Sequence, residues 1–560
     1  MEGARRSRPR GARTGRTLRE RTTEVNDMLL LKNGFIIDGT GEAGYPGSLL
    51  IDGEKIVEVA RGGNDAKCET IDCGGKAVAP GFIDIHSHND WFLVSPDRPE
   101  FITPFLEQGI TTFVGGNCGF GTSGFKKGTA HRGLLENNLF KAGHHGITWD
   151  GLDEYFDRLE RGGMRANLVN LCGHGTTRVS IKGYDPSPMT RAEMDEALRL
   201  IAESMDRGAR GVSFGMGYAP DIFTTPAEQE EVARLVKSRD GIITVHVRAF
   251  SSVSGSYPLK PFGEPHNLKA LREFLDLARK TGVRMHISHL IFVGARTWKT
   301  LDRALALIDR AIDDGVDVRF DTYAHHCGAT VITGILPEWF MAEVPAAYDN
   351  PKLLKKTRML MKISFALLGF NTADMQLASA NHPELDQFNG MFLADIARER
   401  KMTYFENYID IAKRSDSTAR MLLHKYGNPE ITDALMKHRA SHFMTDAWVE
   451  PSGLQNPAAY GCFPRFLQLA RERKLLSLED AVHRMTGKNA ERMRIPGRGF
   501  LRKGYAADIT VFDHEGVRDN TTTADSGVRP GGIDMVFVNG ARVVRGGRAD
   551  TSVMAGEAIR

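Results

Sequence analysis

Short apolar runs, each interrupted by a turn-forming pair of residues, occupy both ends of the chain. Near the N-terminus the turns fall at Asn33-Gly34 and Asp52-Gly53, and near the C-terminus at Asn539-Gly540. An Asn-Gly or Asp-Gly pair between two apolar runs is typical of a β-hairpin. The pattern therefore predicts strands at both ends, paired into one small β-sandwich built from residues 28–80 and 496–560.

Between these ends, short apolar runs alternate with helical stretches, which is the pattern of a parallel α/β sheet. There are eight such runs, the number that closes a barrel. We therefore expect an α/β fold with a (β/α)8 TIM-like barrel over residues 81–495. The runs are KAVAPGFIDIH, GITTFVGG, ANLVNLCGH, ARGVSFG, GIITVHV, VRMHISHL, DVRFDTYA and ASHFMTD.

A long stretch with helical periodicity, at about residues 336–439, separates the seventh run from the eighth. Loops that follow barrel strands build the active sites of this fold. The stretch is therefore a candidate lid over the barrel mouth.

Composition narrows the range of partners. Lys and Arg number 73 against 70 Asp and Glu, and this balance gives no reason to expect nucleic acid. No apolar run reaches the roughly 18 residues of a membrane span, so we expect no membrane partner. Six cysteines in 560 residues are too sparse for a disulfide framework, which favours a cytoplasmic protein. Nothing in the sequence indicates an oligomeric state.

The first 27 residues depart from this balance because they contain eight arginines. No apolar stretch follows that could form the core of a signal peptide. A transit peptide or a nucleic-acid arm would fit, but we expect residues 1–27 to be a disordered basic tail or the product of an overlong start site.

Candidate metal ligands end several of the predicted strands. His86 and His88 end the first run, and residues two apart in a strand share a face, so the two imidazoles can bind one metal. Cys118 ends the second run between glycines, although a lone cysteine there could equally be a small buried apolar residue. His246 and His289 end the fifth and sixth runs.

Four histidines and one cysteine at these strand ends are difficult to explain as structural residues alone. Sulfur and imidazole ligands together favour zinc over magnesium or calcium. Asp446 ends the eighth run and would add a carboxylate beside the metal.

These motifs resemble those of the D-aminoacylase (N-acyl-D-amino-acid deacylase) family of the amidohydrolase superfamily. The resemblance runs from residue 28 to the C-terminus and implies a zinc-dependent hydrolase that acts on a linear amide bond of a small molecule. The segments that carry it are GFIDIHSHND, GGNCG, GHGTTR, HVR, HISHL, DTY and the stretch from TDA to ITVFD.

The resemblance also implies roles for residues. Cys118, His246 and His289 are expected to hold one zinc tightly, and His86 and His88 to mark a second, weaker metal position. Zinc lowers the pKa of its bound water from 15.7 toward about 7. That water is expected to attack the amide, and Asp446 is expected to act as the general base and then as the general acid.

Other strand-end residues are candidates for substrate binding. Arg248 lies two residues past His246 and shares its face, where it could contact the substrate or form a structural ion pair. His174 and Tyr323 end the third and seventh runs and are expected to line the pocket.

The chain departs from the family where the substrate's free carboxylate is bound. Ile291 stands where the family usually has lysine, Ala329 where it has serine, and residues 457–459 where it has arginine. We therefore expect an intact hydrolytic site that accepts a different substrate, with Ile291 as an apolar contact.

Two other functions remain open on the sequence. A cyclic-amide hydrolase of the hydantoinase type is disfavoured because the fourth run lacks the lysine that bridges two metals in many superfamily relatives. A non-enzymatic relative that binds a small molecule is disfavoured because the candidate metal ligands and Asp446 are all retained.

Overall fold

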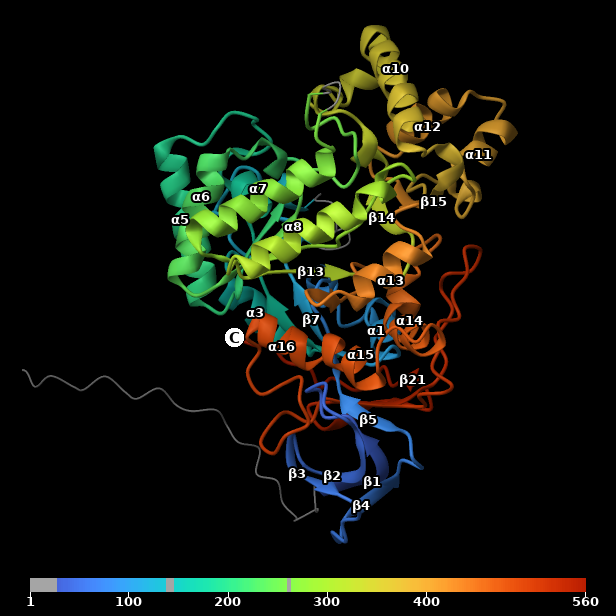
Figure 1. Cartoon of the computed structure of the whole chain (residues 1–560). Coiled ribbons are helices and arrows are strands. Elements are labelled where there is room, and N and C mark those ends of the chain that lie inside the picture. Colours follow the sequence, from blue (N-terminus) through green and yellow to red (C-terminus); the bar gives the residue numbers. More distant parts are fainter. Residues whose placement is uncertain (1–27, 137–145, 259–262) are drawn as a thin grey trace, which may run out of the picture.

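The computed structural model describes residues 28–136, 146–258 and 263–560, so the expected basic tail at residues 1–27 lies outside the described residues. Figure 1 shows the three parts of the molecule. A β-rich part made from both chain ends lies at the bottom of this view, an α/β body in the middle, and an inserted part at the top. No helix in the described ranges is long and apolar enough to span a membrane.

The strands of the two chain ends form a single nine-stranded sheet in the order β21-β20-β19-β18-β5-β1-β2-β3, with β4 beside β1. The antiparallel pair of β18 with β5 joins the C-terminal strands to the N-terminal ones. One face of the sheet encloses its own buried cluster, which includes Leu49, Ile509 and Phe537. On the other face, Val536 and Val538 belong to the main core. The prediction that both ends build one β domain is confirmed.

Alternation along each strand explains how one sheet serves two cores, since neighbouring side chains point to opposite faces. The strands of this sheet are β1 (Met28–Ile36), β2 (Tyr45–Asp52), β3 (Lys55–Arg61), β4 (Glu69–Asp72), β5 (Ala77–Pro80), β18 (Ile509–Phe512), β19 (Ile533–Val538), β20 (Ala541–Arg545) and β21 (Arg548–Ala549).

Every apolar run that predicted a barrel strand contains a strand, and all neighbouring strands of the body are parallel. They lie in two sheets, β6-β7-β8 and β17-β13-β12-β11-β10-β9. The third run contributes both β8 and β9, separated by Leu171. The strands are β6 (Phe82–Asp84), β7 (Ile110–Gly115), β8 (Asn167–Asn170), β9 (Cys172–Gly173), β10 (Gly211–Gly215), β11 (Ile242–His246), β12 (Arg284–Ile287), β13 (Val318–Thr322) and β17 (Ser441–Phe443).

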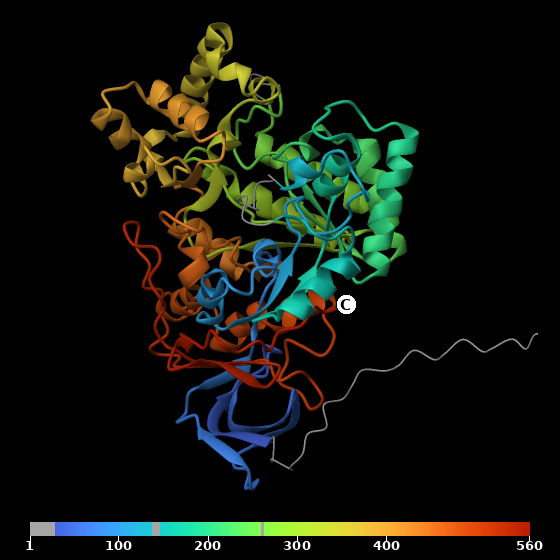
Figure 2. The same ribbon diagram turned by 180° about the vertical axis from the view of Figure 1, so that it is seen from behind.

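Helices cover these parallel strands on the outside, as the view from behind in Figure 2 shows. Two of them begin with a capping box, in which Thr190 or Thr225 bonds the backbone N–H of a glutamate three residues later. The helices are α1 (Thr103–Leu106), α2 (Arg132–Glu136), α3 (Leu152–Gly162), α4 (His174–Lys182), α5 (Arg191–Asp206), α6 (Pro226–Ser238), α7 (His266–Thr281), α8 (Leu301–Asp313), α13 (Pro429–Lys437), α14 (Ala458–Glu472), α15 (Leu478–Met485) and α16 (Gly487–Met493).

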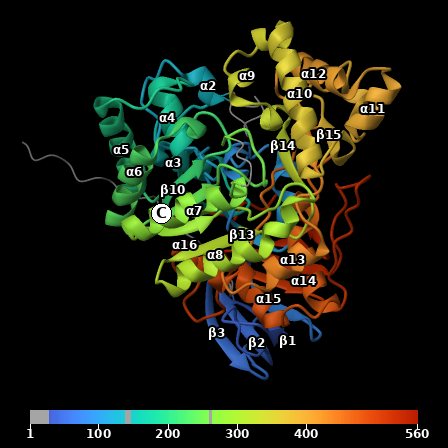
Figure 3. The same ribbon diagram turned by 45° about the horizontal axis from the view of Figure 1, so that its top comes forward.

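The insertion between β13 and β17 differs from its expected bounds of residues 336–439. Its three-stranded antiparallel sheet, β14-β16-β15, begins at Gly328 and ends at Leu423, whereas α13 packs on β17 as part of the body. Figure 3 shows it over one end of the body. Its elements are β14 (Gly328–Val331), α9 (Glu338–Met341), α10 (Pro351–Leu368), β15 (Met375–Ser379), α11 (Leu393–Glu399), α12 (Tyr404–Arg414) and β16 (Arg420–Leu423).

The sequence reading missed this small sheet because its strands contain only four or five residues. An apolar run of that length does not separate a strand from a helix by periodicity. The insertion also has its own buried cluster, which includes Ile332, Phe340 and Met421, so it packs as a unit.

Replacement of Phe466 by alanine should destabilise the strand that leads to Asp446. Phe466 is fully buried and stacks on Phe443 of β17, with ring centroids 3.9 Å apart and planes 3° apart. Removal of a buried ring from a packed core typically costs about 3–5 kcal/mol. Urea unfolding followed by circular dichroism should show a loss of that size.

The exposed Glu472 of the same helix offers a matched control, since Glu472→Ala should change stability by less than about 0.5 kcal/mol. Equal stability of the two variants would mean that the stacked pair does not hold β17 in place.

Candidate metal centre

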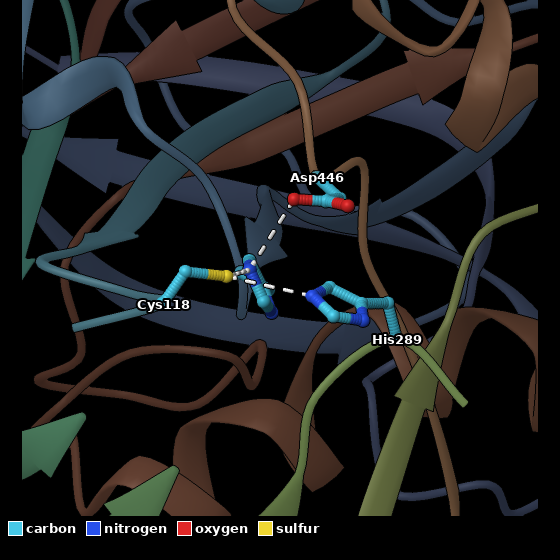
Figure 4. A group of neighbouring side chains, drawn as sticks. Cys118, His289 and Asp446 are labelled. Atoms are coloured by element: carbon cyan, nitrogen blue, oxygen red, sulfur yellow. Dashed lines mark hydrogen bonds and ion pairs between the residues drawn. The ribbon is translucent and has the colours of Figure 1, made fainter. Parts of the chain in front are cut away.

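Side chains from the ends of several parallel strands converge at one point. Figure 4 shows Cys118, His289 and Asp446 directed toward one another from separate parts of the chain. The Cys118 Sγ lies 3.4 Å from His289 Nε2 and 3.8 Å from His246 Nδ1. The two histidine nitrogens are 2.9 Å apart. One sulfur and two nitrogen atoms therefore form a compact triangle.

The histidine pair of the first strand lies on the Asp446 side of this triangle. His86 Nε2 is 3.4 Å from Cys118 Sγ and also 3.4 Å from Asp446 Oδ1. His88 Nε2 is 3.2 Å from the same carboxylate oxygen. One donor atom from each of His86, Cys118, His289 and Asp446 falls within 4.8 Å of all the others.

This donor set fits a zinc ion. A tetrahedral zinc with bonds of about 2.3 Å to sulfur and about 2.0–2.1 Å to nitrogen separates the two kinds of ligand by about 3.6 Å. The distances of 3.4 and 3.8 Å from Cys118 lie on either side of that value. The 2.9 Å between the two histidine nitrogens is a few tenths of an ångström shorter than this geometry requires, a difference that a small ring rotation removes.

The buried carboxylate of Asp321, at the end of β13, contacts the rings of two histidines and the backbone of a third. Its Oδ2 lies 3.3 Å from His86 Nδ1 and 3.0 Å from His286 Nε2, and its Oδ1 accepts the backbone N–H of His289. A carboxylate on the far nitrogen of a metal-binding imidazole fixes the ring and its tautomer. Asp321 was not among the predicted site residues. An aspartate near the end of the apolar run DVRFDTYA is the feature of the sequence that could have identified it.

The electrostatics favour the metal-binding forms of Cys118 and His246, whereas the charges of Asp446 and Cys118 outweigh burial and raise the pKa of His289, so that a metal there must displace a proton. Burial alone would raise the pKa of the Cys118 thiol, but the charges of His86 and His289 outweigh it and hold that pKa well below its usual range. The thiolate is the form of cysteine that binds metal. Burial, together with the charge of His289, lowers the pKa of His246 and favours its neutral, ligating imidazole.

Three residues at the centre adopt left-handed backbone conformations that non-glycine residues rarely take. The φ angles are 53° at Cys118, 31° at His289 and 49° at Asp446. Each such residue costs on the order of 1–3 kcal/mol unless its surroundings enforce it, and such strain concentrates at functional sites. The next residue, Gly119, also has a positive φ of 80°, and a Cβ there would lie 2.4 Å from an oxygen of Asp221, so this position requires glycine.

A cavity of about 270 Å³ opens beside these residues. Its lining includes Cys118, His246, His289 and Asp446 at one end, and Ile291 and Ala329 farther along. Tyr218, Phe250, Tyr426 and Trp448 also line it, and the sequence reading named none of them. Aromatic residues in loops carry no periodic signal, and only their position after strand ends could have identified them.

The candidate substrate residues separate into two groups. Arg248 lines the cavity, but its guanidinium donates to the backbone oxygen of Ile222 at 2.6 Å and lies 3.8 Å from Glu273. Among the described residues, neither His174 nor Tyr323 contributes to the lining. His174 is fully buried and pairs with Asp221 at 2.6 Å.

The expectation of pocket roles for His174 and Tyr323 therefore differs from the structure. His174 begins helix α4 and turns inward with its carboxylate partner, which also accepts the N–H of Gly215. Tyr323 is buried below the cavity, and its hydroxyl has no hydrogen-bond partner in the part of the chain that the structure describes. A strand end alone does not determine whether a side chain faces the mouth or the core.

Relatives of known activity share this architecture. A D-aminoacylase of Alcaligenes xylosoxydans xylosoxydans is 29% identical over 92% of this chain and 94% of its own length. An N-acyl-D-glutamate deacylase of the same organism is 28% identical over 92% of this chain and 93% of its own. The solved N-acyl-D-glutamate deacylase of Bordetella bronchiseptica, complexed with zinc and a phosphonate inhibitor, is 26% identical with a TM-score of 0.74.

That structure covers 95% of this chain and 99% of its own, which confirms the predicted fold class. An L-hydantoinase of Arthrobacter aurescens is more distant, at 15% identity and a TM-score of 0.54 over 95% of this chain and 99% of its own. The sequence itself matches the amidohydrolase family over residues 69–327 and 411–544, more than half of its length. The chain belongs to the amidohydrolase family.

Proposed function

We propose that the protein is a zinc-dependent hydrolase that cleaves the linear amide bond of an N-acyl amine or an N-acyl-D-amino-acid-like substrate. The observation that carries this proposal is the triangle of Cys118, His246 and His289 with Asp446 beside it. Cys118, His246 and His289 would hold the tight zinc, and His86 with His88 would hold a second, weaker one. The deacylases among its relatives support the reaction class.

A divalent metal at this centre supplies a Lewis acid that polarises the amide carbonyl and makes water more acidic. The protein supplies the proton transfers. Asp446 can accept a proton during attack and return it to the leaving nitrogen, because its carboxylate is partly exposed and lines the cavity. His88, 3.2 Å away, holds that carboxylate in position.

The two alternative hypotheses, a hydantoinase-type hydrolase and a non-enzymatic binding protein, have less support. The hydantoinase-type alternative lacks the bridging lysine on β10, and the solved hydantoinase shares only the fold with this chain. A purely binding relative would not need a strained carboxylate at the mouth of the cavity, where Asp446 has a φ of 49°.

The cavity that would receive the substrate contains little positive charge. Among the described lining residues, Arg248 is the one lysine or arginine, and it already bonds Ile222 and approaches Glu273. Arg465 of α14 is not among the lining residues and pairs with Asp519 at 3.3 Å. A free carboxylate on the substrate would therefore lack a dedicated cationic partner.

Replacement of Cys118 by alanine should remove most of the bound zinc. Loss of a thiolate leaves two imidazoles of the tight site and lowers its preference for zinc. The check is metal content by mass spectrometry after purification. Cys172→Ala is a matched control, because Cys172 is also buried and free but lies away from the centre, and its zinc content should equal that of the wild type. Full zinc in the Cys118 variant would refute the ligand assignment.

Replacement of Asp446 by asparagine should lower kcat by at least about 10²-fold, the usual contribution of a general acid/base. The amide has nearly the same shape but cannot carry a proton. Zinc content and the circular dichroism spectrum should stay unchanged, which separates a loss of proton transfer from a loss of metal or fold. A variant that keeps wild-type turnover would exclude Asp446 from the reaction.

N-acetyl-D-leucine should be a poor substrate compared with its carboxamide. A charged hydrogen bond left unmade costs about 1–3 kcal/mol, so the absence of a lysine and an arginine should lower kcat/KM for the free acid by about 10²-fold. A side-by-side assay of the two compounds measures the ratio. Faster cleavage of the free acid, at the rate of an efficient enzyme, would show that the protein recognises the carboxylate by other means.

A further inference from the structure

The cavity extends from the metal centre to a wall that the insertion builds. Helix α10 contributes Leu360, Met361, Phe365 and Leu368 to this wall, and the segment before α9 contributes Ile335 and Leu336. Among the described residues that line it from the insertion, no side chain is charged. The insertion end of the cavity is therefore uncharged and mainly apolar, with Thr330 and Ser364 as polar side chains in its lining, whereas the metal end is polar.

One side chain of this wall belongs to neither the body core nor the insertion core. Leu360 is half-buried and lines the cavity, yet it joins none of the hydrophobic clusters. Ile222, which the body contributes to the lining, is also half-buried and outside these clusters. Apolar side chains that face a cavity without a protein partner gain most when an apolar ligand covers them.

Helix α10 also has a separate outer face, which makes the wall a distinct feature. Met359 and Ile363 are 62% and 44% exposed and point away from the cavity lining. Leu360 therefore faces the cavity while its immediate neighbour faces solvent. Helix α10 therefore offers cavity-facing and solvent-facing positions, one turn or less apart, at which the same substitution can be compared.

We propose that the insertion wall is a subsite for a linear alkyl chain on the amide substrate, so that the protein prefers amphiphilic amides to acetylated ones. This inference rests on the proposed amide hydrolysis at the metal end. The amide lies at the polar end near Asp446, and the chain runs along Leu360 and Phe365 toward Leu336. Each methylene that leaves water for such a wall improves binding about three- to fourfold.

Two substrate series show whether the acyl side or the amine side of the amide carries the alkyl chain that binds the wall. One keeps the amine constant and lengthens the acyl group from acetyl to hexanoyl to decanoyl. The other keeps the acetyl group and lengthens an alkylamine in the same steps. We expect kcat/KM to rise by at least about 10²-fold along one series. Values that stay flat or fall in both series, with acetyl compounds cleaved, would overturn the subsite and leave amide hydrolysis standing.

The variants Leu360→Gln and Phe365→Gln should flatten the dependence on chain length, because a polar side chain replaces an apolar contact. Met359→Gln and Ile363→Gln, on the outer face of the same helix, should preserve it. An equal effect from both pairs would indicate that the helix acts through its stability, which contradicts a binding role for the wall.

Binding measured without turnover keeps the test independent of the proposed reaction. Titration calorimetry with decanol and with hexanol should give clearly tighter binding of decanol to the wild type, and a smaller difference for Leu360→Gln. If no amide is hydrolysed but decanol still binds preferentially, the subsite stands and the proposed function fails. No preference for the longer alcohol would overturn the subsite.

Discussion

The carboxylate of Asp321 is the contact on which the geometry of the metal centre depends. It lies fully inside the parallel sheet, beside His86 and His286 and within reach of the backbone N–H of His289. Its histidine neighbours outweigh the effect of burial and lower its pKa, so it is charged. A buried charge is tolerated when it is fully paired, and here the pairing positions the ring of His86 and the backbone of His289, both of which lie beside Cys118.

The rest of the fold supplies the rigidity that this arrangement needs. Asp84 at the end of β6 accepts the backbone N–H of Thr445 at 2.9 Å, and the N–H of Asp446 donates to the backbone oxygen of His86 at 3.0 Å. The first and last strands of the body are thereby joined where the carboxylate of Asp446 emerges. These contacts support the unusual backbone angle at Asp446, and the N–H bond to Asp321 supports the one at His289.

Periodicity predicted the strands of the body because buried parallel strands are continuous apolar runs, and the residues at their ends contained most of the metal centre. Cys118, His246 and His289 were visible in this way. The direction in which a strand-end side chain points was not visible in the sequence. For that reason His174 was expected in the cavity, whereas it lies in the core. Asp321 and the short strands of the insertion depend on packing between distant segments, which local patterns do not encode.

The central claim is that a cysteine and two histidines from three separate strands bind one metal beside Asp446. X-ray absorption spectroscopy at the zinc edge of the purified protein tests it most directly. We expect one sulfur at about 2.3 Å and nitrogen or oxygen neighbours at about 2.0–2.1 Å from the metal. A metal with nitrogen and oxygen neighbours alone, in the intact and reduced protein, would contradict it.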